Sequence, residues 1–266
     1  MREIILDRPE IRWVLFHPQW EAGTLLPAGA RAVTIPVEPG TAIGGRLYPA
    51  GAEAPAILFF HGNGEIAADY DDVAPLYGRL GLTLLVADYR GYGTSGGSPT
   101  AAHLLSDAVT VFHRLGAVWE EHGLAPARLY VMGRSLGSAA AIEVALHAQE
   151  RLAGLIIESG FADTFALLAR LGVRLAGAEE GRDGFNNAAK MERIATPLLV
   201  IHGRNDRLIP PGDGRELYRH SAAGEANRTL LLIPGAGHND LLWLGQAAYF
   251  RAIGEFASAD RPAIVP

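Results

Sequence analysis

The chain of 266 residues contains no cysteine. This absence excludes disulfide bonds, thiol catalysis and metal sites built from thiolates. The sequence also lacks an excess of basic residues, since 23 Lys and Arg are set against 29 Asp and Glu, and the formal charge is −6. Nucleic acids and anionic membranes attract concentrated positive charge, so neither is an expected partner.

Other signals that would place the chain in a special class are also missing. No apolar stretch is long enough to span a bilayer, and the apolar start 4–6 is interrupted at once by Asp7, Arg8 and Pro9, unlike a signal peptide. A cytoplasmic protein is therefore expected. No repeat, charge block or low-complexity linker divides the chain, which favours one domain over residues 1–266. No metal or phosphate-binding motif occurs, so neither a metal nor a cofactor is expected, and oligomeric state is left open.

Apolar runs alternate with segments of helical periodicity along most of the chain. Two early runs, 32–37 and 43–48, are typical of antiparallel strands, and the later runs are continuously apolar, as in strands buried on both faces. Further strands are predicted at 56–60, 83–87, 129–132, 155–157, 197–201 and 229–233, and helices at 66–80, 102–122, 136–147, 214–221 and 240–256. The alternation predicts an α/β fold with a mostly parallel sheet, helices on both faces and ligands at the carboxyl ends of the strands.

The pentapeptide Gly133-Arg134-Ser135-Leu136-Gly137 lies between an apolar run and a helix of small residues. A serine on a sharp strand-to-helix turn has a strained backbone, and the residues two before and two after it need to lack side chains. The two glycines meet that requirement. The N-terminus of the following helix also directs free N–H groups and the positive end of its dipole at a nearby anion. The pattern predicts Ser135 as a nucleophile.

A serine becomes nucleophilic when a base takes its proton, and the base needs an acid to orient it. In a strand–turn–helix site of this kind the acid and then the base follow the serine along the chain. Asp206 and His238 each follow a predicted strand in that order. We therefore predict Ser135 as nucleophile, Asp206 as acid and His238 as base. Glu158 and Asp163, which follow the strand after the serine, stay open as the alternative acid.

Serine chemistry of this kind also needs two backbone N–H donors for the negative charge that develops on the substrate oxygen. Loss of one such donor typically lowers turnover ~10²–10³-fold. The residue after the nucleophile, Leu136, supplies the first. The second is predicted in His61-Gly62-Asn63-Gly64, which follows an apolar run, with Asn63 as the donor.

These motifs together make the chain resemble the alpha/beta-hydrolase superfamily over residues 31–256. Two more segments carry the resemblance, Asp88-Tyr89-Arg90-Gly91-Tyr92-Gly93-Thr94-Ser95 and His202-Gly203-Arg204-Asn205-Asp206. The chain looks most similar to compact serine hydrolases with a short cap, a branch that holds esterases, depalmitoylase-like thioesterases and serine aminopeptidase-type members. The resemblance implies an alpha/beta-hydrolase fold with a mostly parallel eight-stranded sheet, and substrates among esters, thioesters and amides.

Residues 91–96 match G-x-G-x-x-G after a predicted strand, a pattern also found in dinucleotide-binding folds. That site needs a helix that opens at the third glycine and an acidic residue at the end of the next strand. Here Pro99 delays the helix, and the next strand ends at Gly133. The segment is therefore predicted to be a loop beside the active site, as in the resembled family.

The one long insertion, at about 161–195, lies between two predicted strands, and such loops are usually functional or disordered. An apolar helix face is predicted within it, from Phe161, Phe165, Leu168, Leu171 and Leu175. We expect this short cap to line an acyl pocket over Ser135, chiefly through Phe161, Phe165 and Leu168. The alternative is that the same face packs on the core.

An N-terminal stretch with Trp13, Phe16 and Trp20 has two readings, a cover for part of the sheet or a surface that faces a membrane or a partner. His61 and His202 are expected to support the active-site loops. The sequence as a whole predicts a cofactor-independent serine hydrolase of small-molecule carboxylic esters, with thioesters next and peptide amides third. Two alternatives stay open, a non-catalytic or single-turnover receptor, and a peptidase, acyltransferase or perhydrolase with the same triad.

Overall fold

The computed structural model describes residues 4–23 and 25–258. Within them the strands form one eight-stranded sheet in the order β1-β2-β4-β3-β5-β6-β7-β8. The strands are β1 (Arg31–Glu38), β2 (Thr41–Tyr48), β3 (Ala56–Phe60), β4 (Thr83–Ala87), β5 (Leu129–Arg134), β6 (Gly154–Glu158), β7 (Leu198–Gly203) and β8 (Arg228–Ile233). β2 pairs antiparallel with β1 and with β4, and all other pairs are parallel. The mostly parallel eight-stranded sheet is therefore confirmed.

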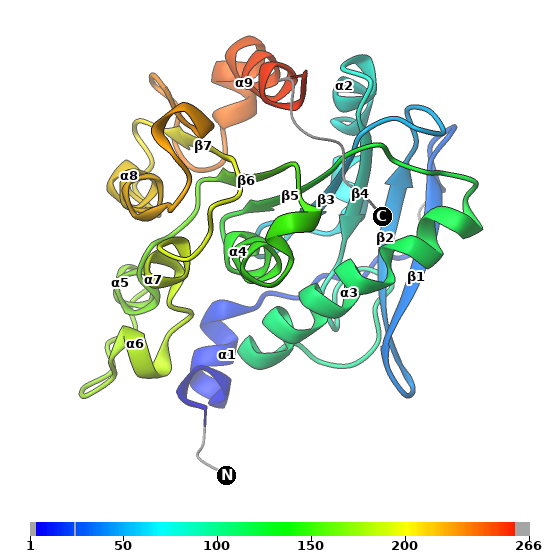
Figure 1. Cartoon of the computed structure of the whole chain (residues 1–266). Helices are drawn as coiled ribbons and strands as arrows, with labels where there is room; N and C mark the ends of the chain where they lie inside the picture. The colour runs from blue at the N-terminus through cyan, green and yellow to red at the C-terminus, as the bar shows by residue number, and fades with distance from the viewer. Residues whose placement is uncertain (1–3, 24, 259–266) are drawn as a thin grey trace.

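Helices cover both faces of this sheet. They are α1 (Pro9–Leu15), α2 (Ala74–Arg79), α3 (Ala101–Glu121), α4 (Gly137–Ala148), α5 (Thr164–Arg170), α6 (Glu180–Asp183), α7 (Asn187–Met191), α8 (Pro211–His220) and α9 (Leu241–Ser258), with short 3-10 helices η1 (Ile5–Asp7), η2 (Ala67–Tyr70), η3 (Gln149–Arg151) and η4 (Glu225–Asn227). In Figure 1, α2 and α9 lie on one side of the strands, and α3 and α4 lie on the other.

The core consists of two apolar layers, one on each face. Successive side chains of a strand point to opposite faces. On β3, Leu58 and Phe60 enter the layer that α3 and α4 cover, whereas Ile57 and Phe59 enter the layer under α2 and α9. All five β3 residues are buried, which explains why the central strands are continuously apolar in sequence.

The helix predicted at 66–80 was wrong in extent, because the structure divides it into η2 and α2. Pro75 is the physical reason. A proline inside a helix removes one backbone hydrogen bond and clashes with the preceding turn, so it is tolerated only near a helix start. α2 accordingly begins at Ala74, with Pro75 in its first turn.

The segment between β6 and β7 contains α5, α6 and α7. α5 begins where the Asp163 carboxylate accepts a hydrogen bond from the N–H of Ala166 at 2.7 Å, a typical N-cap contact. That the chain forms a single domain, and that this segment acts as a cap over the site, both stay predictions.

The N-terminal stretch has one buried and one exposed side. Ile11, Leu15 and Phe16 belong to the core, while Trp13 and Trp20 are exposed. In Figure 1 α1, in blue, lies between α3 and the α5–α7 segment. The Asp7 carboxylate accepts the N–H of Ala101, at the start of α3, and fixes this position. The stretch thus covers part of the core and also presents two tryptophans to solvent.

Candidate active site

Ser135 lies on the turn between β5 and α4 with φ +52°, a left-handed conformation that is uncommon for residues other than glycine. The flanking glycines are needed for close approach. A Cβ on Gly133 would lie 2.2 Å from the main-chain oxygen of Gly137, and a Cβ on Gly137 would lie 2.1 Å from that of Phe60. The turn is the strained strand–helix elbow that the sequence predicts, and it packs directly against the end of β3.

His238 brings together the three side chains that the sequence predicts as a triad. Its Nε2 lies 3.0 Å from Ser135 Oγ, and its Nδ1 lies 2.8 Å from Asp206 Oδ2. A carboxylate only accepts hydrogen bonds, so Nδ1 carries the proton and Nε2 presents its lone pair to the serine hydroxyl. The loops that follow β5, β7 and β8 thus meet at one point, at the carboxyl edge of the sheet.

Asp206 is fixed and ionised by its surroundings. Its other oxygen, Oδ1, accepts the N–H groups of Leu208 at 3.0 Å and Ile209 at 2.8 Å. Burial alone raises the pKa of Asp206, but hydrogen bonding to His202 and His238 outweighs it, so the pKa lies well below the ordinary value. A permanently charged carboxylate in this position can orient the imidazole and stabilise its protonated form.

The two alternative acids are engaged elsewhere. Glu158 accepts hydrogen bonds from Arg134 Nε at 3.0 Å and from the Tyr249 hydroxyl at 2.6 Å. Asp163 caps α5, as described above. Asp206 is the carboxylate that contacts His238.

The two predicted oxyanion donors lie on adjoining turns, because the elbow packs against the end of β3 and Asn63 follows that strand. The side chain of Asn63 is held by two donors, the N–H of His17 and the hydroxyl of Tyr92, each 2.8 Å from Oδ1. Among the described residues, neither the backbone N–H of Asn63 nor that of Leu136 has a protein acceptor. Both groups are therefore free to bind a substrate oxygen.

Arg134, one residue before the serine, is a candidate site residue that the sequence motifs do not single out. Its Nη2 donates to the main-chain oxygen of His238 at 3.0 Å and to Asn239 Oδ1 at 3.1 Å. Its Nη1 pairs with Glu65, and its Nε with Glu158. A signal was available, since a charged residue at the end of a buried strand requires partners.

The Glu65 carboxylate extends this network to the oxyanion loop. Its Oε2 accepts the N–H of Gly62 and the hydroxyl of Tyr70, both at 2.7 Å. Burial raises the pKa of Glu65, but the charge of Arg134 and the hydrogen bonds from Tyr70 and Gly62 together lower it by more, so the carboxylate stays ionised. Arg134 and Glu65 thus connect the loops that carry the nucleophile, the base and Asn63.

The two predicted supporting histidines lie behind these loops. His202 Nε2 is 2.7 Å from the main-chain oxygen of Ile209 and 3.5 Å from Asp206 Oδ2. His61 is fully buried, with Nδ1 2.8 Å from Gly62 O and Nε2 3.2 Å from Asp88 Oδ1. Both rings brace the backbone beside the site.

The predicted acyl-pocket residues differ in exposure. Phe161 and Leu168 are fully buried in the core, and the Phe161 ring packs edge-on against Phe185 with centroids 5.8 Å apart. Phe165 is partly exposed. Core packing, the alternative raised for this face, thus describes two of the three residues, and a role in lining an acyl pocket stays a prediction.

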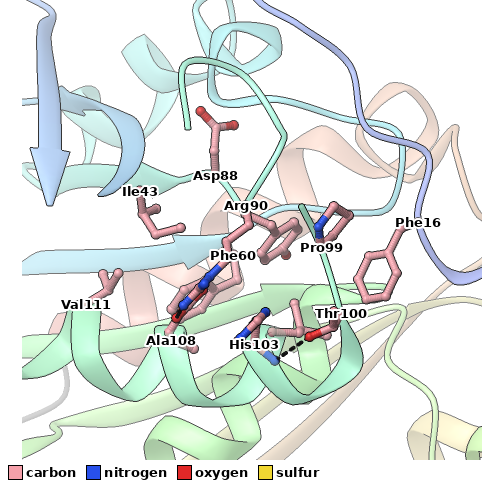
Figure 2. Close-up of a pocket in the computed structure, with 13 residues that line it drawn as sticks. Phe16, Ile43, Phe60, Asp88, Arg90, Pro99, Thr100, His103, Ala108 and Val111 are labelled. Atoms are coloured by element: carbon pink, nitrogen blue, oxygen red, sulfur yellow. Dashed lines mark hydrogen bonds and ion pairs between the residues drawn. The ribbon is translucent and has the colours of Figure 1, made fainter. Parts of the chain in front are cut away.

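The glycine-rich segment 91–96 lies beside the oxyanion loop, where Tyr92 bonds Asn63. Residues on either side of this segment, among them Arg90 and Pro99, line the small cavity of Figure 2 together with Phe16, Phe60 and His103. Its volume of about 10 Å³ admits roughly one water molecule. A cavity of this size is too small for a substrate, and its lining does not include Ser135.

Within residues 4–23 and 25–258, every helix is too short or too polar to span a lipid bilayer. No group of three or more histidines and carboxylates in that part of the chain has the arrangement of a metal site.

The family described as "Serine aminopeptidase, S33" matches residues 51–182 and 172–242. An uncharacterized protein of Mycobacterium tuberculosis is 33% identical over 90% of this chain and 83% of its own length. The human alpha/beta hydrolase domain-containing protein 17B is 28% identical over 77% of this chain and 66% of its own.

A solved structure, the Pyrococcus furiosus esterase Pf2001, superimposes with a TM-score of 0.71 and 22% identity. The match covers 90% of this chain and 97% of that one. At that identity the likeness concerns the fold.

Proposed function

The chain belongs to the alpha/beta-hydrolase superfamily, with a match to its serine aminopeptidase S33 family, and on that premise we propose that it cleaves carboxylic esters through an acyl-enzyme on Ser135. The observation that carries the proposal is the position of the His238 imidazole, with one nitrogen 3.0 Å from Ser135 Oγ and the other 2.8 Å from Asp206. These distances suit proton transfer and orientation of the base.

The first half of the reaction forms the acyl-enzyme. Ser135 Oγ attacks the carbonyl carbon of the ester while His238 Nε2 takes the hydroxyl proton. The carbonyl oxygen becomes an oxyanion, and the N–H groups of Asn63 and Leu136 bind it. The intermediate then collapses, the bond to the alcohol oxygen breaks, and the His238 imidazolium returns its proton to the leaving alcohol.

The second half regenerates the enzyme. His238 takes a proton from a water molecule, whose oxygen attacks the acyl carbon. The resulting oxyanion binds the same two N–H groups. The tetrahedral intermediate then collapses, the carboxylic acid is released, and His238 returns the proton to Ser135 Oγ. Asp206 stays ionised throughout, because its role is to stabilise the imidazolium.

The state of the nearby acidic residues favours an ester over a peptide with a free amino terminus. A serine aminopeptidase needs a free carboxylate for the substrate ammonium group. Glu65 and Glu158 are paired with Arg134, and Asp240 accepts the N–H of Gly237 at 2.6 Å. Both glutamates are thus committed to the protein itself, and Asp240 is engaged at one of its two oxygens.

The test is turnover on matched substrates. Nitrophenyl esters of increasing acyl length, the corresponding thioesters and aminoacyl nitroanilides are each assayed with wild type and Ser135→Ala. We expect multiple turnovers on esters, weaker rates on thioesters, and a loss of up to ~10⁶-fold in kcat for the variant. Turnover restricted to nitroanilides would overturn the ester assignment. Acylation without turnover would indicate the receptor alternative.

A further inference from the structure

An open groove lies between α1 and the turn before α3, outside the triad. We call it the N-terminal groove, and its lining includes Arg12, Trp13, Phe16, His17, Ser98 and Pro99. Its volume of about 550 Å³ falls within the roughly 300–1,000 Å³ typical of small-molecule sites, which are mostly apolar. None of the roles described above uses its exposed surface.

The groove adjoins the oxyanion loop directly. The backbone N–H of His17, one of its lining residues, donates to Asn63 Oδ1 at 2.8 Å. A Cβ on Gly64 would lie 3.9 Å from His17 Cβ, which is van der Waals contact. A substrate whose carbonyl oxygen accepts a hydrogen bond from the N–H of Asn63 is therefore bound by a residue that itself contacts the groove.

The order of the strands decides which part of the substrate faces the groove. Asn63 follows β3, and Ser98 and Pro99 lie in the loop after β4. In the sheet these strands lie on one side of β5, which carries the nucleophile, whereas the acid and the base follow β7 and β8 on the other side. The leaving alcohol needs a proton from His238, so it lies on the β7–β8 side, and the acyl chain is directed to the β3–β4 side.

We propose that the N-terminal groove binds the aliphatic acyl chain of the ester, with Trp13 as its main apolar wall. The proposal rests on the ester hydrolysis proposed above. The groove is formed before any substrate binds, because Arg12 Nε donates to the main-chain oxygen of Pro99 at 3.0 Å and ties α1 to the opposite wall. Trp13 is 78% exposed, so an acyl chain would cover apolar surface that the protein alone leaves in water.

The experiment compares variants that empty or fill the groove. Trp13→Ala removes the wall, and Ser98→Trp fills the space. Trp243→Ala is the matched control, because Trp243 is also a highly exposed tryptophan (88%) but lies on α9, on the side of the base. Each is assayed for kcat/KM on nitrophenyl acetate, hexanoate and decanoate. We expect both groove variants to lower kcat/KM on decanoate about tenfold, while acetate changes less than about twofold and the control keeps the wild-type profile. Melting temperatures check that the exposed substitutions leave the fold intact.

A binding measurement separates this proposal from the catalytic one. Decanoate is titrated calorimetrically into Ser135→Ala protein with Trp13 intact or replaced by alanine. Loss of binding on Trp13→Ala supports the groove even where no ester is turned over, and in that case the hydrolase proposal alone fails. The groove proposal is overturned if esters are hydrolysed but Trp13→Ala and Ser98→Trp change neither the dependence of kcat/KM on chain length nor the binding of decanoate. It is also overturned if Trp243→Ala alone shifts the profile.

Discussion

Arg134 Nη2 donates a hydrogen bond to the main-chain oxygen of His238 across 3.0 Å, so the residue before the nucleophile holds the loop of the base. The same guanidinium pairs with Glu65, which accepts the N–H of Gly62 on the oxyanion loop. A guanidinium group holds five donors in a rigid planar fork and can serve widely spaced acceptors, whereas an ammonium group has three donors on a single nitrogen. The relative position of nucleophile, base and oxyanion donor therefore depends on one side chain.

Arg134→Lys tests this positioning role, because it keeps the charge but not the fork of donors. We expect kcat on a nitrophenyl ester to fall roughly 10–100-fold with KM little changed, since small displacements of catalytic groups are costly. Arg90→Lys is the matched control. Arg90 makes a bidentate contact with Asp107 at 2.6 and 2.8 Å, away from the triad, and its replacement should lower stability without the kcat effect. Equal kcat losses in the two variants would contradict the positioning role.

The acid is tested by two isosteric amides. Asp206→Asn keeps the shape but reverses the tautomer preference of His238, and we expect kcat to fall by roughly 10⁴. Glu158→Gln should instead destabilise the protein, because it removes a charge that pairs with the largely buried side chain of Arg134. Kinetics and thermal melts of both variants check this. A severe kcat loss in the glutamine variant with a mild one in the asparagine variant would move the acid to Glu158.

The lowered pKa of Asp206 gives a pH-dependent prediction for stability. A carboxyl whose pKa is lower in the folded state stabilises the protein above its unfolded pKa, about 3.9, and this stabilisation is lost as the pH falls toward the folded value. Between about pH 5 and pH 3, the melting temperature of wild type should therefore fall more steeply than that of Asp206→Asn. Parallel curves for the two proteins would contradict an ionised, hydrogen-bonded Asp206.

The elbow glycines give a prediction about packing. A Cβ at Gly137 would collide with the main-chain oxygens of Phe60 and His61, so Gly137→Ala should destabilise the fold by roughly 1–3 kcal/mol and lower activity. Gly116, inside α3, has no atom within 4 Å of its would-be Cβ. Gly116→Ala should therefore stabilise the protein by about 0.5–1 kcal/mol. Chemical denaturation of both variants measures the difference, and equal effects would refute the close approach at the elbow.

The sequence predicted the features that local chemistry determines. Ser135 and His238 lie in short motifs at the ends of apolar runs, and these runs became the central strands. The periodicity of residues 66–80 predicts one helix, but Pro75 is tolerated only near a helix start, so the segment forms η2 and a separate α2. Phe161 and Leu168 have the spacing of an apolar helix face, which fits a pocket wall or a core, and both are buried. Periodicity alone does not distinguish a pocket from a core.

Contacts between distant segments were beyond reach of the sequence alone. Arg134 meets Glu65 and His238, which lie 69 and 104 residues away along the chain, and no motif encodes those pairings. The same holds for His17, whose backbone reaches Asn63 across 46 residues. From the sequence, the N-terminal stretch could therefore cover part of the sheet or face a partner. Its position beside the oxyanion loop became visible only in the folded structure.

Covalent labelling with a fluorophosphonate, followed by intact-mass measurement and peptide mapping, tests the central claim most directly. The probe reacts with serine hydroxyls that a neighbouring base activates. We predict one adduct per chain, located on Ser135, with no adduct on Ser135→Ala and slow labelling of His238→Ala. An adduct on another residue, or undiminished labelling of Ser135→Ala, would contradict the account.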